Sequence, residues 1–228
     1  MLVKAFSKKF YSSQSTCLNA LGIATAPPIF RSIASTTYAS RTNTTVTAPA
    51  GILNNDILIG TIFLGLNPTA PTPTAPSGFT LISSTNVTYQ SFNGKMFVYW
   101  KRASSESGSY TFTHSAASSQ GVIAAYSGAI TSGSPIDVFS TNTGSGATTT
   151  ATTITTTFNN EINLYIAHDW EGLGTLNPPT GMSERFDGLV YISDVGRPTA
   201  GATGNRTQTN NNDSVSPWGA MQISIRAL

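Results

Sequence analysis

Residues 95–102 read Lys-Met-Phe-Val-Tyr-Trp-Lys-Arg, and this stretch is the strongest indication of the fold in the chain. The five residues between its basic ends are apolar, and most of them are of the aromatic or β-branched types that are enriched in strands. Because successive side chains of a strand point to opposite faces, an unbroken apolar run places apolar groups on both faces. We therefore predict a central strand over 95–102 that is covered on both sides.

The segments on either side continue this pattern as short runs separated by turns. Clusters of Gly, Pro, Asn and Ser interrupt runs of β-branched and aromatic residues at intervals of roughly 8 to 15 residues, which is typical of sandwiches and barrels. No window shows a convincing helical period. Residues 148–157 are almost wholly Thr, so we expect that strand at an edge or facing solvent. Besides 95–102, the predicted strands are 44–48, 57–66, 80–84, 109–114, 122–127, 148–156, 162–168, 184–192 and 220–226.

The composition excludes several classes of protein. Only 10% of the 228 residues are charged, against about 25% in a typical soluble domain, so a coiled coil or long helical bundle is excluded. The net charge of +2 argues against disorder, and a single cysteine, Cys17, allows no internal disulfide. The best apolar run, 57–66, is about half the length of a transmembrane helix. With 34 Thr and 28 Ser, we predict an all-β protein: a two-sheet antiparallel β-sandwich, jelly-roll-like, with an extended N-terminal arm.

Three segments are predicted to be loops. Residues 67–76 hold four prolines and should be extended. Residues 170–180 contain two glycines and two prolines. Residues 197–217 are polar and rich in Asn, and loops of that length are usually functional or flexible.

The two halves of the chain echo each other. The run Asn54-Asn55-Asp56-Ile57 returns as Asn159-Asn160-Glu161-Ile162, and Pro76-Ser77-Gly78-Phe79 returns as Pro179-Thr180-Gly181-Met182. Two weaker matches follow in the same order, between Val98-Tyr99 and Val190-Tyr191 and between Gly121 and Gly219. These echoes favour an internal two-fold repeat within a single sandwich domain, 33–228, with halves at 44–140 and 148–226 that share one core.

Residues 1–32 are predicted to form an extended, basic, Ser-rich arm. No acidic residue precedes Asp56, so residues 1–55 carry a charge of +5 from three lysines and two arginines. Two other interpretations stay open: a mitochondrial transit peptide, which has a similar composition, and an arm that packs on its own domain. We expect another subunit to hold the arm through Lys4, Phe6, Lys8, Lys9, Phe10 and Tyr11.

A series of short motifs in the first half is similar to a known family. The series is Pro49-Ala50-Gly51, Asn55-Asp56-Ile57-Leu58-Ile59, Pro76-Ser77-Gly78-Phe79-Thr80-Leu81, Val98-Tyr99-Trp100-Lys101-Arg102-Ala103, Tyr110-Thr111-Phe112, Ala125-Tyr126-Ser127-Gly128 and Ser134-Pro135-Ile136-Asp137. Their order and spacing, over about residues 40–140, resemble a β-sandwich family common among bacteriophage structural proteins. The resemblance implies a virion-surface or cell-surface role in capsid decoration, in a head or tail appendage or in adhesion, and it supplies no catalytic residue.

No catalytic, cofactor-binding or metal-binding residue is predicted, and no cofactor. The nucleophile motif G-x-S-x-G, the P-loop and the dinucleotide fingerprint are absent from the sequence. One local concentration of metal-ligating types, His168-Asp169-Trp170-Glu171, is interpreted as a polar strand end rather than a cation or sugar site. His114 is expected to be a solvated loop residue. Asp56 and Glu161 are expected to accept backbone hydrogen bonds at the starts of their strands and are interpreted as structural.

Together these observations predict a non-enzymatic structural protein of a phage virion. We expect a capsid decoration or cement subunit on the capsid surface, with a tail location left open, whose arm binds the major capsid protein or neighbouring virion subunits. A homo-oligomer is expected. Neither nucleic acid nor a membrane is expected as a partner, since Lys and Arg form no large cluster. The alternative is a tail-fibre or appendage module that binds host-surface carbohydrate by stacking on Trp170, Tyr191 and Trp218.

Overall fold

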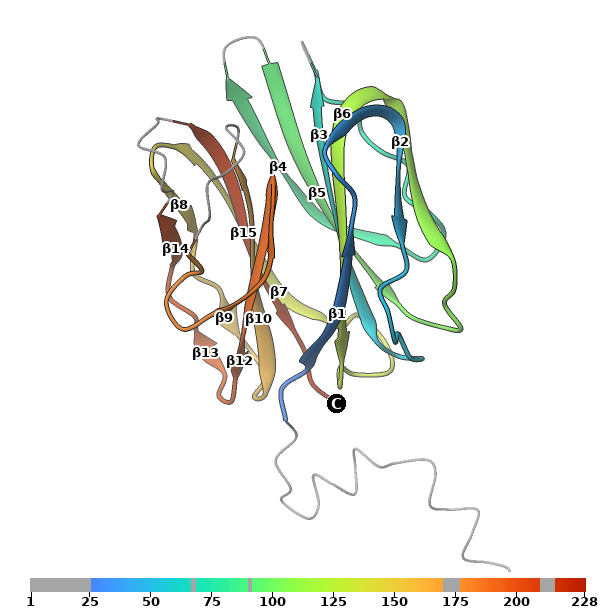
Figure 1. Ribbon diagram of the computed structural model, residues 1–228. Helices are drawn as coiled ribbons and strands as arrows, with labels where there is room; N and C mark the ends of the chain where they lie inside the picture. Colours follow the sequence, from blue (N-terminus) through green and yellow to red (C-terminus); the bar gives the residue numbers. More distant parts are fainter. Residues whose placement is uncertain (1–25, 67–68, 90–91, 170–176, 210–215) are drawn as a thin grey trace, which may run out of the picture.

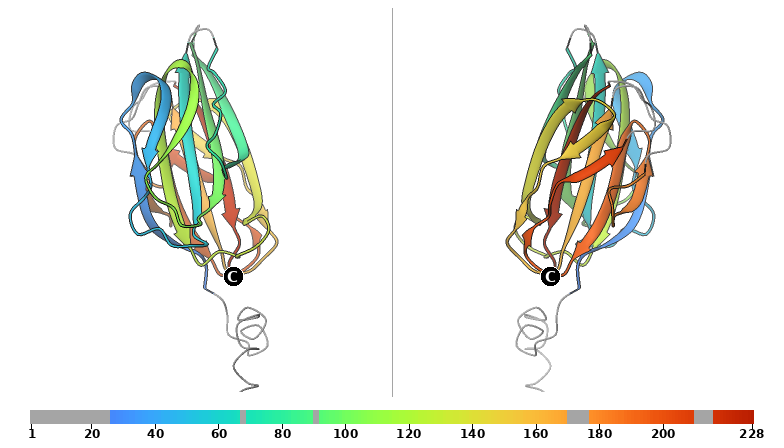
Figure 2. Two further views of the ribbon diagram at one scale, coloured as in Figure 1. Left: turned by 90° about the vertical axis from the view of Figure 1, so that its right-hand side faces the viewer. Right: turned by 90° about the vertical axis from the view of Figure 1, so that its left-hand side faces the viewer.

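The protein is a β-sandwich of two antiparallel sheets, which confirms the predicted fold class. The computed structural model describes residues 26–66, 69–89, 92–169, 177–209 and 216–228. The two sheets stack face to face as separate layers (Figure 1), and Figure 2 shows the outer side of each sheet in turn. Within the described residues, no helix has the length and apolarity needed to span a membrane.

The first sheet has the strand order β1-β6-β3-β5-β4, with β2 paired to β6 as well. Its strands are β1 (Ile29–Ser35), β2 (Ala39–Thr47), β3 (Ile57–Leu66), β4 (Thr80–Tyr89), β5 (Phe92–Arg102) and β6 (Ser109–Ser127).

The second sheet has the order β11-β12-β10-β15-β7, and two small two-stranded sheets accompany it, β8 with β14 and β9 with β13. The strands are β7 (Ile136–Ser145), β8 (Thr148–Ala151), β9 (Thr155–Thr156), β10 (Glu161–Asp169), β11 (Ser183–Asp187), β12 (Val190–Arg197), β13 (Gly201–Ala202), β14 (Arg206–Thr209) and β15 (Pro217–Ile225).

The two sheets have the same internal order. Reading the second sheet as β7-β15-β10-β12-β11 places each strand where the first sheet has β1, β6, β3, β5 and β4. The echoed motifs precede equivalent strands, and Asn55 and Asn160 share a positive φ, as do Gly78 and Gly181. This correspondence favours the predicted internal repeat. Because each sheet is made from one contiguous part of the chain, the jelly-roll-like part of the prediction is not supported.

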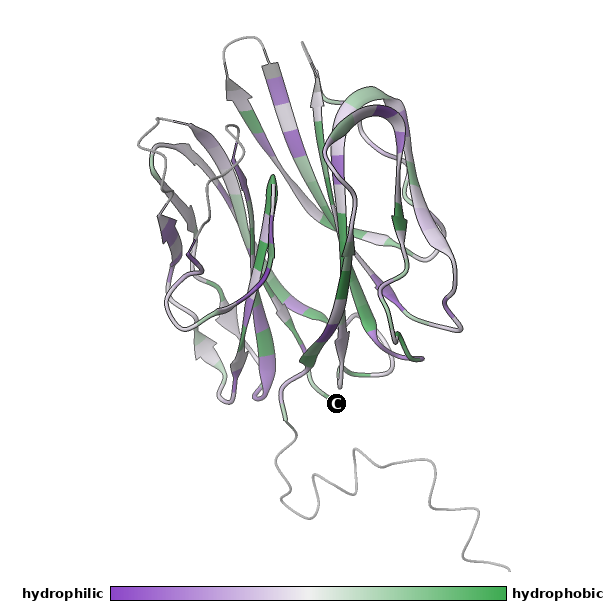
Figure 3. Cartoon of the chain, in the orientation of Figure 1, coloured by the Kyte–Doolittle hydropathy of each residue, from purple (hydrophilic) through white to green (hydrophobic). Residues whose placement is uncertain are grey.

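The main core lies between the sheets. It is formed by inward-facing apolar residues of the central strands β3, β5, β6, β10, β12 and β15, including Ile59, Val98, Leu164 and Ile223. Figure 3 shows the apolar residues along these strands. The other face of β5 carries Phe97 and Tyr99, which are buried in a separate cluster. The prediction that the strand at 95–102 is covered on both sides is therefore confirmed.

Each sheet also has a covered outer face. On the first sheet, β2 packs over Ile62, Phe97 and Phe112, and Phe79 joins the same cluster. Part of the proline-rich segment predicted to be extended also lies here, since Thr74 forms a β-bridge with Thr113. On the second sheet, Ala151 of β8 packs in a smaller cluster with Tyr165, Tyr191 and Trp218.

Several strand predictions need correction. The runs predicted at 109–114 and 122–127 form one strand, β6, while the run at 184–192 is divided into β11 and β12. The segment 197–217, predicted to be a loop, contains β13 and β14, which pair with the Thr-rich strands β9 and β8. Among the described residues, those Thr-rich strands each pair with one neighbour only, so the predicted edge position is confirmed, although alternate residues such as Thr149 and Ala151 are buried. Finally, the sandwich begins at Ile29, so the expected arm boundary at residue 32 falls inside β1.

The ends of the sandwich differ. The chain enters β1 at one end, and the C-terminal residues lie at the same end, where Ala227 pairs with Ala129 and the Leu228 amide donates to the Gly128 carbonyl. Figure 1 shows this end at the bottom. We call it the arm end. The other end holds the β4–β5 hairpin and the last residues of β3, β7 and β10.

Candidate functional site

The arm end carries the largest group of exposed apolar side chains. Among the described residues, seven large apolar side chains are exposed, and four of them belong to this end: Ile29, Leu53, Phe158 and Leu228. Ile29 begins β1, Leu53 and Phe158 lie in the turns before β3 and β10, and Leu228 is the last residue. Exposed apolar groups gathered at one place are typical of an interaction surface. The predicted arm anchors, Lys4, Phe6, Lys8, Lys9, Phe10 and Tyr11, lie outside the described residues.

The first echoed turn forms an ion-paired corner at this end. Asp56 is buried, and its carboxylate accepts a hydrogen bond from the Leu53 backbone N–H at 2.8 Å, as expected from the sequence. The Arg31 guanidinium pairs with the same carboxylate, with 2.6 Å from Nε to Oδ2. The corner therefore compensates the charge that burial of Asp56 would otherwise leave unpaired.

Among the described residues, no cation forms an ion pair with the acid of the second echoed turn. Glu161 is fully buried, and the Ser224 hydroxyl donates a hydrogen bond to its Oε2. The pKa of Glu161 is raised to about 7, mainly by burial and also by Asp137, although the Ser224 hydrogen bond and the charge of Arg226 act to lower it. The expected backbone hydrogen bond to Glu161 is not among its contacts, so its structural role differs from that of Asp56.

The register of the two sheets explains this difference. In the first sheet, Phe30, which precedes Arg31, pairs with Tyr126 of β6, and Tyr126 pairs in turn with Ile57 of β3. In the second sheet, Ile136, which precedes Asp137, pairs with Ile225 of β15, and Ile225 pairs in turn with Ile162 of β10. Asp137 therefore holds the place in the second half that Arg31 holds in the first. As a result Glu161 faces a second carboxyl group, and this neighbour disfavours the ionised form of Glu161.

In the part of the chain that the structure describes, neither histidine joins a cluster of metal-ligating side chains. His168 is buried, its ring packs on Phe63 with 5.1 Å between centroids, and burial lowers its pKa to about 3. His114 is also buried, with Nε2 2.9 Å from the Thr44 hydroxyl and Nδ1 2.8 Å from the Ser115 carbonyl oxygen. The expectation of a solvated His114 is thus wrong, because β6 continues through this position and β2 covers it. Across the described ranges, no three His, Cys, Asp or Glu side chains converge.

The aromatic residues predicted to stack on sugars are not placed for that role. Tyr191 is fully buried and Trp218 is 6% exposed, and both lie in the cluster on the outer face of the second sheet. Trp170 lies outside the described residues. The prediction fails for Tyr191 and Trp218 because both pack in a buried cluster with Ala151 of β8, and β14, in the segment predicted to be a loop, pairs with β8.

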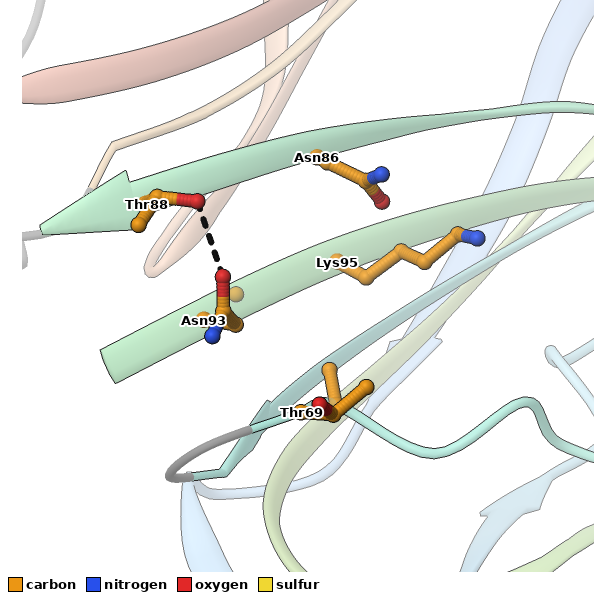
Figure 4. A pocket seen from close by; sticks show the side chains of 7 residues that line it. Thr69, Asn86, Thr88, Asn93 and Lys95 are labelled. Atoms are coloured by element: carbon orange, nitrogen blue, oxygen red, sulfur yellow. Dashed lines mark hydrogen bonds between the residues drawn. The ribbon is translucent and has the colours of Figure 1, made fainter. Parts of the chain in front are cut away.

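The end opposite the arm has two polar hollows that meet at Asn86. One, of about 350 Å³, lies between the edge strands of the two sheets and is lined by Ser84, Thr85, Asn86, Thr141, Asn142 and Thr143. The other, of about 180 Å³, lies on the β4–β5 hairpin and includes Thr69, Asn86, Thr88, Asn93 and Lys95. Figure 4 shows these five side chains around the second hollow, with the Thr88 hydroxyl donating to Asn93 Oδ1 at 2.8 Å. We call the two hollows together the Asn86 surface.

Sequence reasoning missed the Asn86 surface. Its residues come from β4, β5, β7 and the segment after β3, and in the sequence they are ordinary Thr and Asn residues in a chain rich in both. The local signal is an alternation along β4, in which Thr85 and Val87 are buried while Asn86 and Thr88 are exposed.

Comparisons with protein-family models, with curated proteins and with solved structures gave no match.

Proposed function

We propose that this chain is a non-enzymatic structural subunit on the surface of a phage particle, a decoration or cement protein. Its arm, residues 1–32, binds the major capsid protein or a neighbouring subunit, and the sandwich is displayed outward. Many copies act together, so each contact can be weak while the whole array is stable.

One observation carries the proposal: the basic arm leaves the sandwich at the end where the exposed apolar residues gather. Ile29, Leu53, Phe158 and Leu228 are exposed at the end of the sandwich where the chain enters β1. An apolar end face combined with a basic segment that precedes it fits a partner surface with apolar and acidic sites. The motif series that resembles phage structural proteins supports the same conclusion.

The construction of the sandwich suits a particle component. Three apolar clusters, one between the sheets and one on each outer face, give a rigid body. Charged residues make up only 10% of the chain, so neighbouring subunits can pack against its hydroxyl-rich faces without removing many ions from water.

Cryo-electron microscopy of whole particles from the source tests the proposal. We expect this chain as an ordered array on the shell, with the Leu53 and Phe158 turns against the shell and the β4–β5 hairpin pointing away. Density confined to a tail, density with the hairpin against the shell, or particles without this chain would each contradict the proposed function.

A matched pair of variants tests the contact itself. Leu53 and Leu81 are both exposed, 60% and 50% respectively, but Leu81 lies on the edge strand β4. Removing a leucine that becomes buried costs about 1.5–3 kcal/mol, so Leu53→Ser should weaken co-sedimentation with particles about tenfold or more. Leu81→Ser should leave it unchanged. Equal effects of the two substitutions would show that the arm end is not the contact.

A further inference from the structure

We infer that the Asn86 surface is a binding site for an acidic glycan. This inference goes beyond the proposed function and does not depend on it, because the surface lies at the opposite end of the sandwich from the arm. It also replaces the stacking site predicted from Trp170, Tyr191 and Trp218 with a site made of hydrogen-bonding groups.

The chemistry of the lining selects for sugars. The larger hollow is lined only by Ser, Thr and Asn residues, and the smaller one adds further Thr and Asn residues and one lysine. Amide and hydroxyl side chains both donate and accept hydrogen bonds, which matches the alternating donors and acceptors of sugar hydroxyls. The larger hollow, of about 350 Å³, is open to solvent, so its polar groups are accessible to an extended sugar chain.

Other ligand classes fit the lining less well. A nucleic acid needs several cations to neutralise successive phosphates, and Lys95 is the one cation among the lining residues. A protein partner is usually anchored by apolar or aromatic side chains in a pocket, and neither hollow is lined by a large apolar residue.

Lys95 supplies the preference for an acidic sugar. Its Nζ lies 5.0 Å from the centroid of the Phe97 ring, and among the described residues no carboxylate forms an ion pair with it. By contrast, Lys101 on the same strand is paired with Glu106 at 3.0 Å. The ammonium of Lys95 is therefore available to a sugar carboxylate, at the side of the surface away from β7.

The supporting side chains are already held in place. Thr88 is hydrogen-bonded to Asn93, and the Asn142 amide donates to the Thr150 carbonyl at 2.9 Å. Thr85 lies 3.3 Å from Nε2 of the buried His168. In the part of the chain that the structure describes, the Asn86 side chain has no hydrogen-bond partner, and Figure 4 shows it on the same side of the hairpin as Lys95. A surface positioned in advance loses less entropy when a ligand binds.

A glycan array of neutral and uronic-acid-containing bacterial surface polysaccharides tests the inference, with the full chain as the probe. We expect binding to acidic glycans. Asn86→Ala should weaken it about tenfold, the effect of losing one to two well-made hydrogen bonds. Asn43→Ala is the matched control, since Asn43 is likewise an exposed strand asparagine, and it should bind as the unmodified chain does.

The array also separates the role of Lys95 from that of the amides. Lys95→Gln should remove the preference for acidic over neutral glycans, while Lys95→Arg should keep it. Circular dichroism spectra of all four variants must match that of the unmodified chain. Absence of binding to every glycan on the array, or binding that is unchanged in Asn86→Ala, would overturn the inference without affecting the test of particle attachment.

Discussion

Replacement of Glu161 by glutamine should change how the stability of the protein depends on pH. Glu161 is fully buried with Asp137 in the place where the first half has Arg31, and its pKa is raised from the ordinary value of 4.5 to about 7. The folded state therefore holds the proton more tightly than the unfolded chain does. Stability from this group is complete below pH 4.5 and is lost as the pH rises through about 7.

The size of the effect follows from the two pKa values. Each tenfold difference in proton affinity corresponds to about 1.4 kcal/mol, so the loss between pH 4.5 and 7.5 amounts to about 3 kcal/mol. Glutamine keeps the shape of the protonated acid and cannot ionise. The Glu161→Gln variant should therefore gain stability relative to the unmodified chain as the pH rises, by the same amount.

Urea unfolding followed by circular dichroism at half-unit steps from pH 4.5 to 8 measures this difference. Glu106→Gln is the matched control. Burial raises the pKa of Glu106, but hydrogen bonds from Tyr110, Ser104 and Lys101 outweigh this and hold it below the ordinary value. The stability that Glu106 contributes is therefore lost only as the pH falls. Above pH 5, the free energy of unfolding of Glu106→Gln should change with pH in the same way as that of the unmodified chain. Parallel profiles for Glu161→Gln and the unmodified chain would refute the reasoning.

Three further outcomes are expected. Gly121→Ala should lower stability by about 1–3 kcal/mol, measured by thermal unfolding, because a Cβ there would lie 2.6 Å from a methyl group of β2; an unchanged midpoint would mean that β2 is not packed on β6. Arg31→Ala should cost about 2–3 kcal/mol in urea unfolding, since it leaves the buried carboxylate of Asp56 without its cation, and a cost near zero would contradict the ion-paired corner. Tyr191→Ala should destabilise the fold by about 3 kcal/mol or more and leave glycan binding by the surviving folded fraction unchanged, because Tyr191 is fully buried. Loss of binding without loss of stability would restore Tyr191 as a contact residue.

Much of the fold could be predicted from local patterns in the sequence. The run at 95–102 predicted a strand covered on both faces, and the predicted strand at 57–66 has the observed bounds of β3. The echoed turns also predicted related corners, and Asn55 and Asn160 do share a positive φ. These successes have one cause: strand periodicity and turn chemistry depend on neighbours in the sequence.

The failures concern residues whose surroundings come from distant parts of the chain. His114 was expected in solvent, yet β2 buries it through Thr44, which is 70 residues away. Tyr191 was expected at a surface, yet it is buried in a cluster with Ala151 of β8 and Trp218 of β15. The local sequence around a polar or aromatic residue near a predicted loop is the same whether or not another layer of strands covers that residue in the fold.

The fold class, most of the strands, the low charge and the two echoed turns can all be read from the amino-acid sequence, because they depend on composition and on periods of two residues. The pairing of Asp56 with Arg31, and the position of Glu161 opposite Asp137, arise from the packing of the folded chain. The same packing also gathers the exposed apolar residues at the arm end and brings β4, β5 and β7 together at Asn86. Strand register and the stacking of two sheets place side chains from remote segments within a few ångströms of each other, and no local pattern encodes those pairings.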